Sequence, residues 1–365
     1  MILKELTVIN FKNIAEANFS FTPGFNCFVG RNGVGKTNIL DAIYHLSMCK
    51  SYFNLPDLQN IRHDEPFFVV QGKYERAGEE INVYCGVKRG QKKTFKKNQK
   101  AYEKLSEHIG LLPLVMISPE DVGLIDGGSE ERRRLMDGII SQCDRSYLHH
   151  LICYNKTLMQ RNSLLKASAG HGLDYDSMEL WNERLAEYGE AIMARRIAFL
   201  EEFRQVFQTY YEWISLGREE VELVYKQSVE SGGLSKALHD STERDRILTY
   251  TSCGIHRDDL LLNIGKYPVR KIGSQGQKKT FLIALKLAQY DWLMKMSGVK
   301  PLLLLDDVFD KLDADRVNQI VKTVGGEQFG QTFMAETNRE HLDEILKSPP
   351  ADYRLFSVKQ GGMPE

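Results

Sequence analysis

Both ends of the chain show period-two alternation of apolar and polar residues or short apolar runs, which predicts β-strands there. Pro301–Leu305 contains four consecutive leucines and fits a strand that is buried on both faces of a parallel sheet. The full set of predicted strands is Leu3–Ile9, Ala17–Phe21, Phe25–Val29, Phe67–Tyr74, Ile81–Val87, Leu112–Ile117, Asp258–Ile264, Pro301–Leu305 and Thr332–Glu336.

The middle of the chain has the 3.6-residue apolar period of helices instead. Glu130–Lys166 and Ser177–Ile214 are long helical stretches, and Ala169–Gly172 between them interrupts any helix. This pattern predicts an antiparallel helical hairpin. The heptad repeat is not strict, so we expect a bundle or a short arm rather than a long coiled coil. An ordinary helical subdomain is the alternative interpretation.

Two further helices flank this region in sequence, at Thr37–Met48 and at Lys278–Met294. Strands and helices therefore alternate at both ends, and helices alone fill the centre. The predicted fold class is α/β, with mixed and parallel sheets and an inserted helical domain. We expect a head formed by residues 1–122 plus 246–365, split by a helical arm at 123–245.

A phosphate-binding loop follows the strand Phe25–Val29. The segment fits G-x-x-x-x-G-K-[ST] at every fixed position and opens a helix. Its glycines let backbone N–H groups approach phosphate oxygens, and the helix adds its positive end. Lys36 is predicted to reach the β- and γ-phosphates, and the Thr37 hydroxyl to bind Mg²⁺. The predicted ATP-binding residues of the loop are Gly30, Arg31, Asn32, Gly33, Val34, Gly35, Lys36 and Thr37.

A second part of this site is predicted at the other end of the chain, where the leucine strand runs into Asp306 and Asp307. In P-loop enzymes such a strand lies beside the loop. Its first carboxylate holds Mg²⁺, and the next polarises the attacking water. We therefore predict Asp306 as a metal-side residue and Asp307, with Lys36, as catalytic. An apolar run ending in Asp is a weak signal alone and becomes strong beside the loop.

Composition limits the remaining choices. Hydrophobic residues make up 42% of the chain and no apolar run approaches the ~20 residues of a membrane span. Six scattered cysteines without a C-x-x-C pair indicate free thiols in a reducing compartment. We expect a cytoplasmic protein. The net charge is −1, so any nucleic-acid site must be a local patch.

The densest basic run lies between Lys88 and Lys100 and is predicted to form a hairpin that turns at Arg89–Gly90. Lysines of this kind often only protect a solvated edge strand from aggregation. The alternative is contact with a DNA backbone, without base readout. The candidate DNA-binding residues are Lys88, Arg89, Lys92, Lys93, Lys96, Lys97 and Lys100. Arg132–Arg134 is a second candidate, although Glu130–Glu131 beside it equally suits an internal ion-pair role.

The segment Ser274-Gln275-Gly276-Gln277 precedes a lysine-rich helix. A serine beside a glycine at a helix start can bind an anion, and taken alone it is as readily a helix cap. A phosphate loop, this segment, an acidic strand and the following Phe309–Asp313 turn, in that order, resemble an ABC-type ATPase head.

The split head with its helical insertion resembles the SMC/Rad50-like branch of the ABC ATPases, and within it the RecF family of bacterial recombination mediators. The resemblance runs nearly end to end. In the first part of the chain the matching segments are Leu6–Asn13, with its F-[RK]-N turn, and Gly35–Tyr44. A third match runs from Pro119–Asp121 through Gly127 and includes Arg132, Arg133, Met136 and Asp137. Further along, Gly254–Asp259 resembles G-P-H-R-D-D, and Ser274–Gln277 matches the S-Q-G-Q signature.

This resemblance implies a specific mode of action. The signature Ser274, Gln275, Gly276 and Gln277 would close over the nucleotide of a second subunit, so that the site is complete only in an ATP-bound homodimer. It implies a weak, DNA-stimulated ATPase that binds duplex DNA near single-strand gaps and works with RecR and RecO to help load RecA. It also places a γ-phosphate sensor near Thr337 and the Mg²⁺-linked glutamine loop near Ser118–Asp121.

Several residues depart from the family pattern. Ser129 and Ile255 each stand where Pro is usual, and Leu135 stands where an aromatic residue is usual. Asp310–Asp313 replaces S-E-L-D. The main rival interpretation is another SMC-like head, such as a nuclease or defence subunit. The short arm and Gly254–Asp259 disfavour it. A metabolic P-loop kinase has no use for Ser274–Gln277, and ATP-dependent dimerisation would exclude it.

Overall fold

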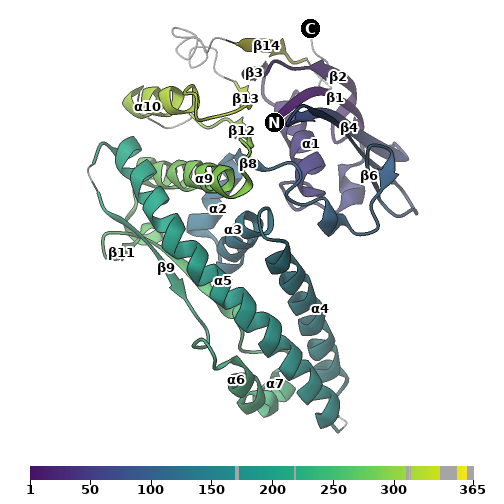
Figure 1. The fold of residues 1–365 in the computed structure, drawn as a ribbon, viewed down its shortest axis with the longest axis vertical. Coiled ribbons are helices and arrows are strands. Elements are labelled where there is room, and N and C mark those ends of the chain that lie inside the picture. The colour runs from purple at the N-terminus through teal and green to yellow at the C-terminus, as the bar shows by residue number, and fades with distance from the viewer. Residues whose placement is uncertain (169–171, 218, 310–311, 313, 338–351, 360–365) are drawn as a thin grey trace. The chain divides into compact units, whose positions relative to one another are not determined.

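The computed structural model describes residues 1–168, 172–217, 219–309, 312, 314–337 and 352–359. The chain divides into two compact units (Figure 1). The first comprises Met1–Asp121, Trp213–Leu216 and Gln275–Glu365, and the second comprises Val122–Glu212 and Gly217–Ser274. The sequence places the return to the head at residue 246. The structure groups residues 246–274 with the second unit, because β10 (Asp259–Ile264) pairs with β9 (Val221–Lys226) there.

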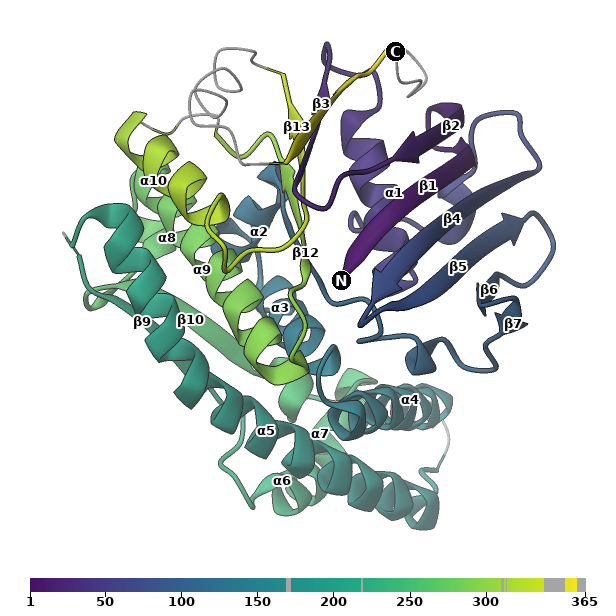
Figure 2. The ribbon, with the colours of Figure 1, turned by 45° about the horizontal axis from the view of Figure 1, so that its top comes forward.

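A six-stranded antiparallel sheet forms one layer of the first unit, in the order β2-β1-β4-β5-β6-β7. Figure 2 shows β2, β1, β4 and β5 side by side. Alternate residues of β4 and β5 are buried, as expected of strands with one face on the core. The strands are β1 Ile2–Phe11, β2 Ile14–Ser20, β4 Phe67–Arg76, β5 Glu79–Lys88, β6 Thr94–Lys97 and β7 Lys100–Ala101.

The other layer is a parallel sheet in the order β14-β3-β13-β12-β8. Its inner strands are buried on both faces, which explains their continuous apolar runs. The strands are β3 Phe25–Val29, β8 Leu114–Ile117, β12 Leu302–Asp306, β13 Thr332–Glu336 and β14 Tyr353–Ser357. The helices of this unit are α1 Lys36–Met48, α9 Gln275–Ser297 and α10 Ala314–Val324, with the 3₁₀ turns η1 Asp57–Asn60, η2 Leu105–Glu107 and η3 Pro119–Asp121.

The core of the first unit lies between these two sheets. Helix α1 contacts β1 and β4 of one sheet and β12 and β13 of the other, while α9 packs on β8. Ile39, Ile43 and Leu46, the predicted apolar face of α1, are completely buried. At one end of the core Gln331 donates from its side-chain amide to the Leu3 carbonyl and accepts from the Leu3 N–H, which ties β1 to the start of β13.

The second unit is mainly helical and carries a three-stranded antiparallel sheet in the order β11-β10-β9. Its elements are α2 Val122–Asp126, α3 Ser129–Ser141, α4 Arg145–Ala167, α5 Tyr175–Ser215, β9 Val221–Lys226, α6 Leu234–Asp240, α7 Thr242–Leu248, η4 Ile255–Arg257, β10 Asp259–Ile264, β11 Tyr267–Pro268 and α8 Val269–Ile272. The α/β class and the mixed and parallel sheets with a helical insertion are therefore confirmed.

The first long helical stretch is divided into α3 and α4, which the apolar period did not reveal. Asp144 caps α4, because its carboxylate accepts the N–H of Tyr147 at 2.9 Å. The predicted break at Ala169–Gly172 falls largely outside the described residues. All six cysteines are free thiols, as expected. Across the described part of the chain, every helix is too short or too polar to cross a membrane.

Two histidines, His45 and His108, are completely buried and make the fold sensitive to acid, and His108 is the clearer case. Its Nε2–H donates to the Leu46 carbonyl at the end of α1 at 2.7 Å, and its Nδ1 lies 3.1 Å from the Tyr102 hydroxyl. Burial lowers the pKa of His108 from 6.5 to about 4. The unfolded chain therefore binds a proton in this window that the folded chain does not, so stability falls as the pH drops from 6.5 towards 4.

We predict that His108→Gln, which cannot titrate, removes part of this loss. Between pH 8 and pH 5 the variant should lose less unfolding free energy than the wild type, by on the order of 2 kcal/mol. Urea unfolding at a series of pH values measures the difference. Parallel pH profiles for the two proteins would contradict the assignment.

Candidate functional site

The phosphate loop occupies the turn between β3 and α1 as predicted. Gly33 and Gly35 have φ values of 79° and 117°, a region that residues with a Cβ rarely adopt. A Cβ on Gly35 would lie 2.8 Å from the Asn13 Oδ1, so the position is closed to larger residues by contact as well. Gly35 is also the N-cap of α1 and has no side chain with which to cap it, which leaves the first-turn N–H groups to a phosphate.

Asn13, from the turn between β1 and β2, clamps the loop. Its side-chain amide donates to the Gly33 carbonyl at 3.1 Å, and its Oδ1 accepts from the Asn38 amide at 2.8 Å. The phosphate-loop motif alone did not single out Asn13. The F-[RK]-N turn of the family resemblance was the one signal for it.

Lys36 lies at the centre of the loop and is almost fully buried. Its ammonium donates to the Gly30 and Arg31 carbonyls at 2.7 and 3.0 Å. Burial lowers the pKa of Lys36, while the charges of Asp307, Asp306 and Glu336 oppose this shift. Lys36 is thus a buried cation under the electrostatic influence of three carboxylates.

The acidic end of β12 meets the loop, although the two come from opposite ends of the chain. The Thr37 hydroxyl donates to the Asp306 Oδ1 at 2.9 Å. In the sheet, β13 stands between β3 and β12, so the contact is made above the carboxyl edge of the sheet and not between neighbouring strands. Burial raises the pKa of Asp306 to about 6, and the hydrogen bond from Thr37 opposes that shift.

Asp307 follows in a left-handed conformation with φ 45°, which Asp tolerates better than most residues. Its N–H donates to the Ala335 carbonyl at 3.0 Å, and its Oδ1 is 3.4 Å from the Thr337 hydroxyl. Thr337, the predicted γ-phosphate sensor position, therefore lies beside the predicted catalytic carboxylate. Sequence reasoning missed Glu336, which ends β13 in register with Val29 and is 3% exposed.

The donors gathered here are hard oxygen ligands, a hydroxyl and carboxylates, and these suit Mg²⁺. Three carboxylates act on Lys36 among the described residues, and a divalent cation would offset their excess of negative charge. The residues present thus fit the predicted metal.

The signature segment begins α9. Ser274 directly precedes the helix, and Ser274 and Gln275 are exposed, while Gly276 and Gln277 are half-buried. A Cβ on Gly276 would lie 2.8 Å from a guanidinium nitrogen of Arg316 in α10, which is the end of a flexible side chain and can move aside. Asp310, Lys311 and Asp313 of the following acidic turn lie outside the described residues.

The basic run forms the end of β5, a turn at Arg89–Gly90, and the strands β6 and β7. The predicted hairpin is confirmed, and we call the segment from Lys88 to Lys100 the basic hairpin. Four of its candidate residues are exposed: Lys88, Arg89, Lys92 and Lys100. Lys96 and Lys97 are half-buried, and the Lys96 ammonium lies 5.5 Å from the centre of the Tyr84 ring.

Lys93 differs from the other lysines of the basic hairpin, because its side chain turns inward and is 12% exposed. Its ammonium donates to the Cys49 carbonyl at 2.5 Å and to the Asp57 Oδ1 at 2.9 Å. Cys49 is the C-cap of α1, so Lys93 neutralises the negative end of the helix that begins at the phosphate loop. We therefore exclude Lys93 from the surface that could contact DNA.

The second arginine cluster has internal partners. Arg132 makes a two-point ion pair with Asp259 at 2.8 and 3.0 Å, and Arg133 donates to the Asp258 carbonyl at 2.6 Å. Arg134 pairs with Glu130 and Glu131. The ion-pair interpretation of Arg132–Arg134 therefore agrees with these contacts better than the DNA interpretation.

Two buried arginines that sequence reasoning missed hold the second unit together. Arg161 donates to Asp245 at 2.7 Å and to the Thr251 hydroxyl at 2.8 Å. Arg196 donates to Asp137 at 2.8 Å and to the Ile255 carbonyl at 3.2 Å. The segment Gly254–Asp259 is thus a structural centre of this unit. Buried arginines cannot be told from surface ones by apolar period alone.

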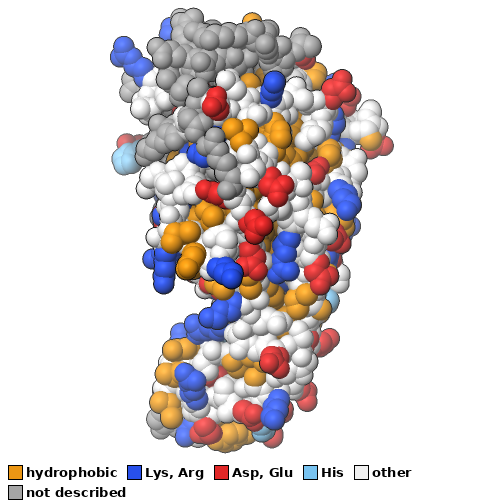
Figure 3. All heavy atoms as spheres, turned by 90° about the vertical axis from the view of Figure 1, so that its left-hand side faces the viewer, with side chains coloured by type: hydrophobic (Ala, Val, Ile, Leu, Met, Phe, Trp, Pro, Cys, Tyr) orange, Lys and Arg blue, Asp and Glu red, His pale blue; other side chains and the backbone are white. Residues whose placement is uncertain are grey.

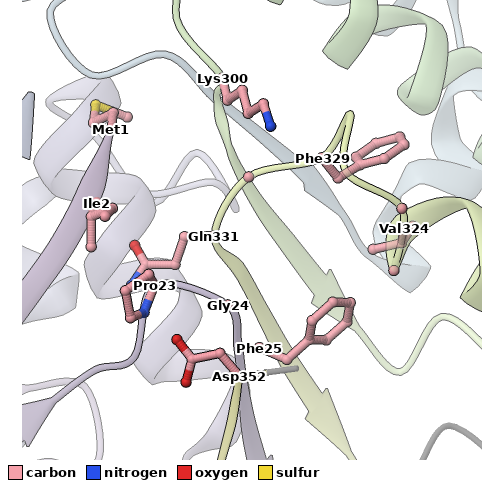
Figure 4. Close-up of a pocket in the computed structure, with 13 residues that line it drawn as sticks. Met1, Ile2, Pro23, Gly24, Phe25, Lys300, Val324, Phe329, Gln331 and Asp352 are labelled. Atoms are coloured by element: carbon pink, nitrogen blue, oxygen red, sulfur yellow. The ribbon is translucent and has the colours of Figure 1, made fainter. Parts of the chain in front are cut away.

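The surface pocket of the first unit does not belong to the nucleotide site. A pocket of about 370 Å³ lies where β3, β12 and β13 begin, at the sheet edge opposite the phosphate loop (Figure 4). It includes Phe25, Lys300 and Gln331 and belongs to a different part of the first unit. The face in Figure 3 intersperses basic with acidic side chains, in line with the net charge of −1.

Comparison with known proteins identifies the family to which the chain belongs. The family model described as RecF/RecN/SMC N terminal domain matches residues 2–360. The chain is 53% identical to the DNA replication and repair protein RecF of Phocaeicola vulgatus, with 100% of the chain and 98% of the relative covered. It is 50% identical to the protein of that name from Flavobacterium johnsoniae, with 98% and 100% covered.

Solved structures agree. A structure described as the recombination mediator protein RecF–ATP in the RecFOR pathway superimposes with a TM-score of 0.88 at 33% identity, over 98% of this chain and 96% of the other. An SMC head bound to the C-winged helix domain of ScpA has a TM-score of 0.57 at 17% identity, over 99% and 95%, which shows a shared fold alone. The chain therefore belongs to the RecF family, within the SMC-like branch of the ABC ATPases.

Proposed function

We propose that this chain is an ATP-switched DNA clamp of recombinational repair and replication-fork maintenance. It binds MgATP, dimerises, holds duplex DNA near single-strand gaps and hydrolyses ATP slowly, with stimulation by DNA. In this role it works with RecO and RecR to help load RecA, in the cytoplasm. In this proposal the first unit is the ATPase head and the second unit is the helical arm, and these observed boundaries replace the limits of 1–122 plus 246–365 and 123–245 expected from the sequence.

The hydrogen bond from Thr37 to Asp306 is the observation that carries the nucleotide part of the proposal. It brings the phosphate loop and the acidic strand into one site, which a P-loop ATPase requires. Family membership and the solved RecF–ATP relative support ATP as the nucleotide.

Each residue of the site takes a defined role. The loop N–H groups and Lys36 bind the β- and γ-phosphates, and Thr37 with Asp306 would hold Mg²⁺. The bound metal supplies charge neutralisation for the phosphate oxygens. Asp307 polarises the attacking water, with the Thr337 hydroxyl beside it. Thr337 carries no charge, unlike a protonated histidine, and this agrees with slow turnover.

Dimerisation follows from the signature segment. Ser274 and Gln275 are exposed at the start of α9, where a helix N-terminus can bind an anion. We propose that Ser274–Gln277 of one subunit closes over the γ-phosphate in the other. ATP then acts as a bridge between two subunits, and its hydrolysis releases them.

DNA binding is assigned to the exposed part of the basic hairpin. Lys88, Arg89, Lys92 and Lys100 are exposed, with Lys96 and Lys97 at their side. A dimer doubles this patch, and two copies on one duplex bind more tightly than one. Nucleotide state and DNA affinity are coupled in this way.

Two substitutions should shift the dimer in opposite directions. Ser274→Arg leaves the phosphate loop intact and places a bulky cation in the contact with the second subunit, so the protein should bind ATP as a monomer. Asp307→Asn keeps the left-handed backbone, which Asn also tolerates, and removes the catalytic charge, so an ATP-bound dimer should accumulate. Light scattering with and without MgATP measures both.

Lys36→Ala serves as the control, because it should lose nucleotide affinity and stay monomeric throughout. A wild type that remains monomeric with MgATP would refute the clamp. A dimeric Ser274→Arg, or wild-type hydrolysis by Asp307→Asn, would refute the corresponding assignment.

Neighbouring lysines allow a matched test of DNA contact. Lys92→Gln removes an exposed charge and should lower the slope of log affinity against log salt by about one unit per lost phosphate contact, for unrelated sequences alike. Its stability should stay within about 0.5 kcal/mol of the wild type. Lys93→Gln should leave the slope unchanged and destabilise the fold by about 1–3 kcal/mol, because the buried Cys49 carbonyl and the Asp57 carboxylate lose their charged donor.

Fluorescence anisotropy of a labelled duplex at several salt concentrations gives the slopes, and urea unfolding gives the stabilities. The opposite ranking, with the slope changed in Lys93→Gln alone, would move the DNA surface away from the exposed lysines.

A further inference from the structure

Glu336 is a buried acidic residue of the nucleotide site to which the proposed mechanism gives no role. It is the last residue of β13 and is 3% exposed. Its Oε1 accepts the N–H of Thr337 at 2.9 Å, an interaction that suits a negatively charged acceptor. Asp306 and Asp307 already supply the metal-side and catalytic carboxylates, so the presence of a third needs a separate explanation.

The parallel sheet places Glu336 between the two parts of the site. Strand β13 lies between β3, which leads into the phosphate loop, and β12, which ends at Asp306. Glu336 is in register with Val29, the residue before Gly30, and it follows Ala335, which is in register with Asp306. It therefore stands at the carboxyl edge, between the two elements that are proposed to hold the phosphates and the metal.

The charge of Glu336 acts on the central residues of the site. Burial lowers the pKa of Lys36, and Glu336 is one of three carboxylates that oppose this shift. Burial also raises the pKa of Asp306, and the charge of Glu336 adds to that rise. Glu336 thus contributes negative charge to a site that has to accept a polyanion.

Free ATP and its magnesium complex differ in charge, because the bound cation offsets part of the negative charge of the phosphates. Repulsion between a fixed carboxylate and a ligand grows with the negative charge of the ligand, and it is screened less at a buried position than at the surface. An additional carboxylate at this edge therefore disfavours the metal-free nucleotide more than the magnesium complex.

We propose that Glu336 is a specificity-determining residue that makes the site select the magnesium complex of ATP over metal-free ATP. It acts through its charge, without a bond to the metal or to the phosphates. A site filled by metal-free ATP would lack the cation that phosphoryl transfer needs, so this selection prevents unproductive complexes. The inference rests on the proposed nucleotide function and deepens it.

Three substitutions at Glu336 separate charge from shape. Glu336→Gln removes the charge, and its amide oxygen can still accept the Thr337 N–H. Glu336→Ser removes the charge with a smaller side chain, so that the test does not depend on one variant, and Glu336→Asp keeps the charge. Glu327→Gln is the matched control, because Glu327 is an exposed glutamate that precedes the opposite end of β13.

The dissociation constant of a fluorescent ATP analogue is measured for each protein with excess Mg²⁺ and with excess EDTA. Glu336→Gln and Glu336→Ser should bind the metal-free analogue at least about tenfold more tightly than the wild type does, and the magnesium complex within about threefold, since the less charged ligand is repelled less. Glu336→Asp and Glu327→Gln should match the wild type in both conditions. Circular dichroism establishes that each variant is folded.

Unchanged affinity for the metal-free analogue in the two neutral variants would overturn the inference, and so would an equal gain in both conditions. Weaker binding of the magnesium complex alone would make Glu336 a metal ligand instead, and loss of folding in both neutral variants would make its role structural. A wild type that binds the analogue in neither condition would refute the proposed nucleotide site itself, and this inference with it.

Discussion

The parallel sheet of the first unit has to be assembled from both ends of the chain, and the rest of the molecule follows from this constraint. Strand β3 comes from the first thirty residues, β8 from just before residue 120, and β12 and β13 from beyond residue 300. Only when these strands pair do Thr37 and Asp306 meet. The helical unit is consequently an insertion, and it must leave and rejoin the sheet at defined points.

That assembly concentrates charge at the carboxyl edge of the sheet. Lys36, Asp306, Asp307 and Glu336 come from three different segments and influence one another electrostatically. Burial raises the pKa of Asp306 and lowers the pKa of Lys36, so each charge is disfavoured alone and gains from a partner. A site of this kind is prepared for a ligand that carries both negative phosphates and a divalent cation.

Much of this could be predicted from sequence, for a physical reason. The phosphate loop depends on residues adjacent in the chain, and β12 has a continuous apolar run of the kind that a strand buried on both faces requires. The family resemblance located Ser274–Gln277. Short edge strands such as β7 and β14, and the small helices α6 and α7, lack a distinct period and were not predicted.

The residues that sequence reasoning missed are those whose role depends on a distant partner. Lys93 looks like its neighbour Lys92 until Asp57 and the Cys49 carbonyl are in place. Lys286 sits in a predicted amphipathic helix, and only the fold shows that it faces Asp121. The spacing of apolar residues identifies which side of a helix or strand is buried, but it does not identify which buried polar groups pair with each other.

A double-mutant cycle on Thr37 and Asp306 tests most directly whether the two chain ends form one nucleotide site. The affinity for MgATP would be measured for Thr37→Val, for Asp306→Asn and for the two combined. We predict a coupling energy of at least about 1 kcal/mol, because each side chain acts through the other and through the same metal. Strictly additive losses would contradict it, since independent residues cannot share one metal site.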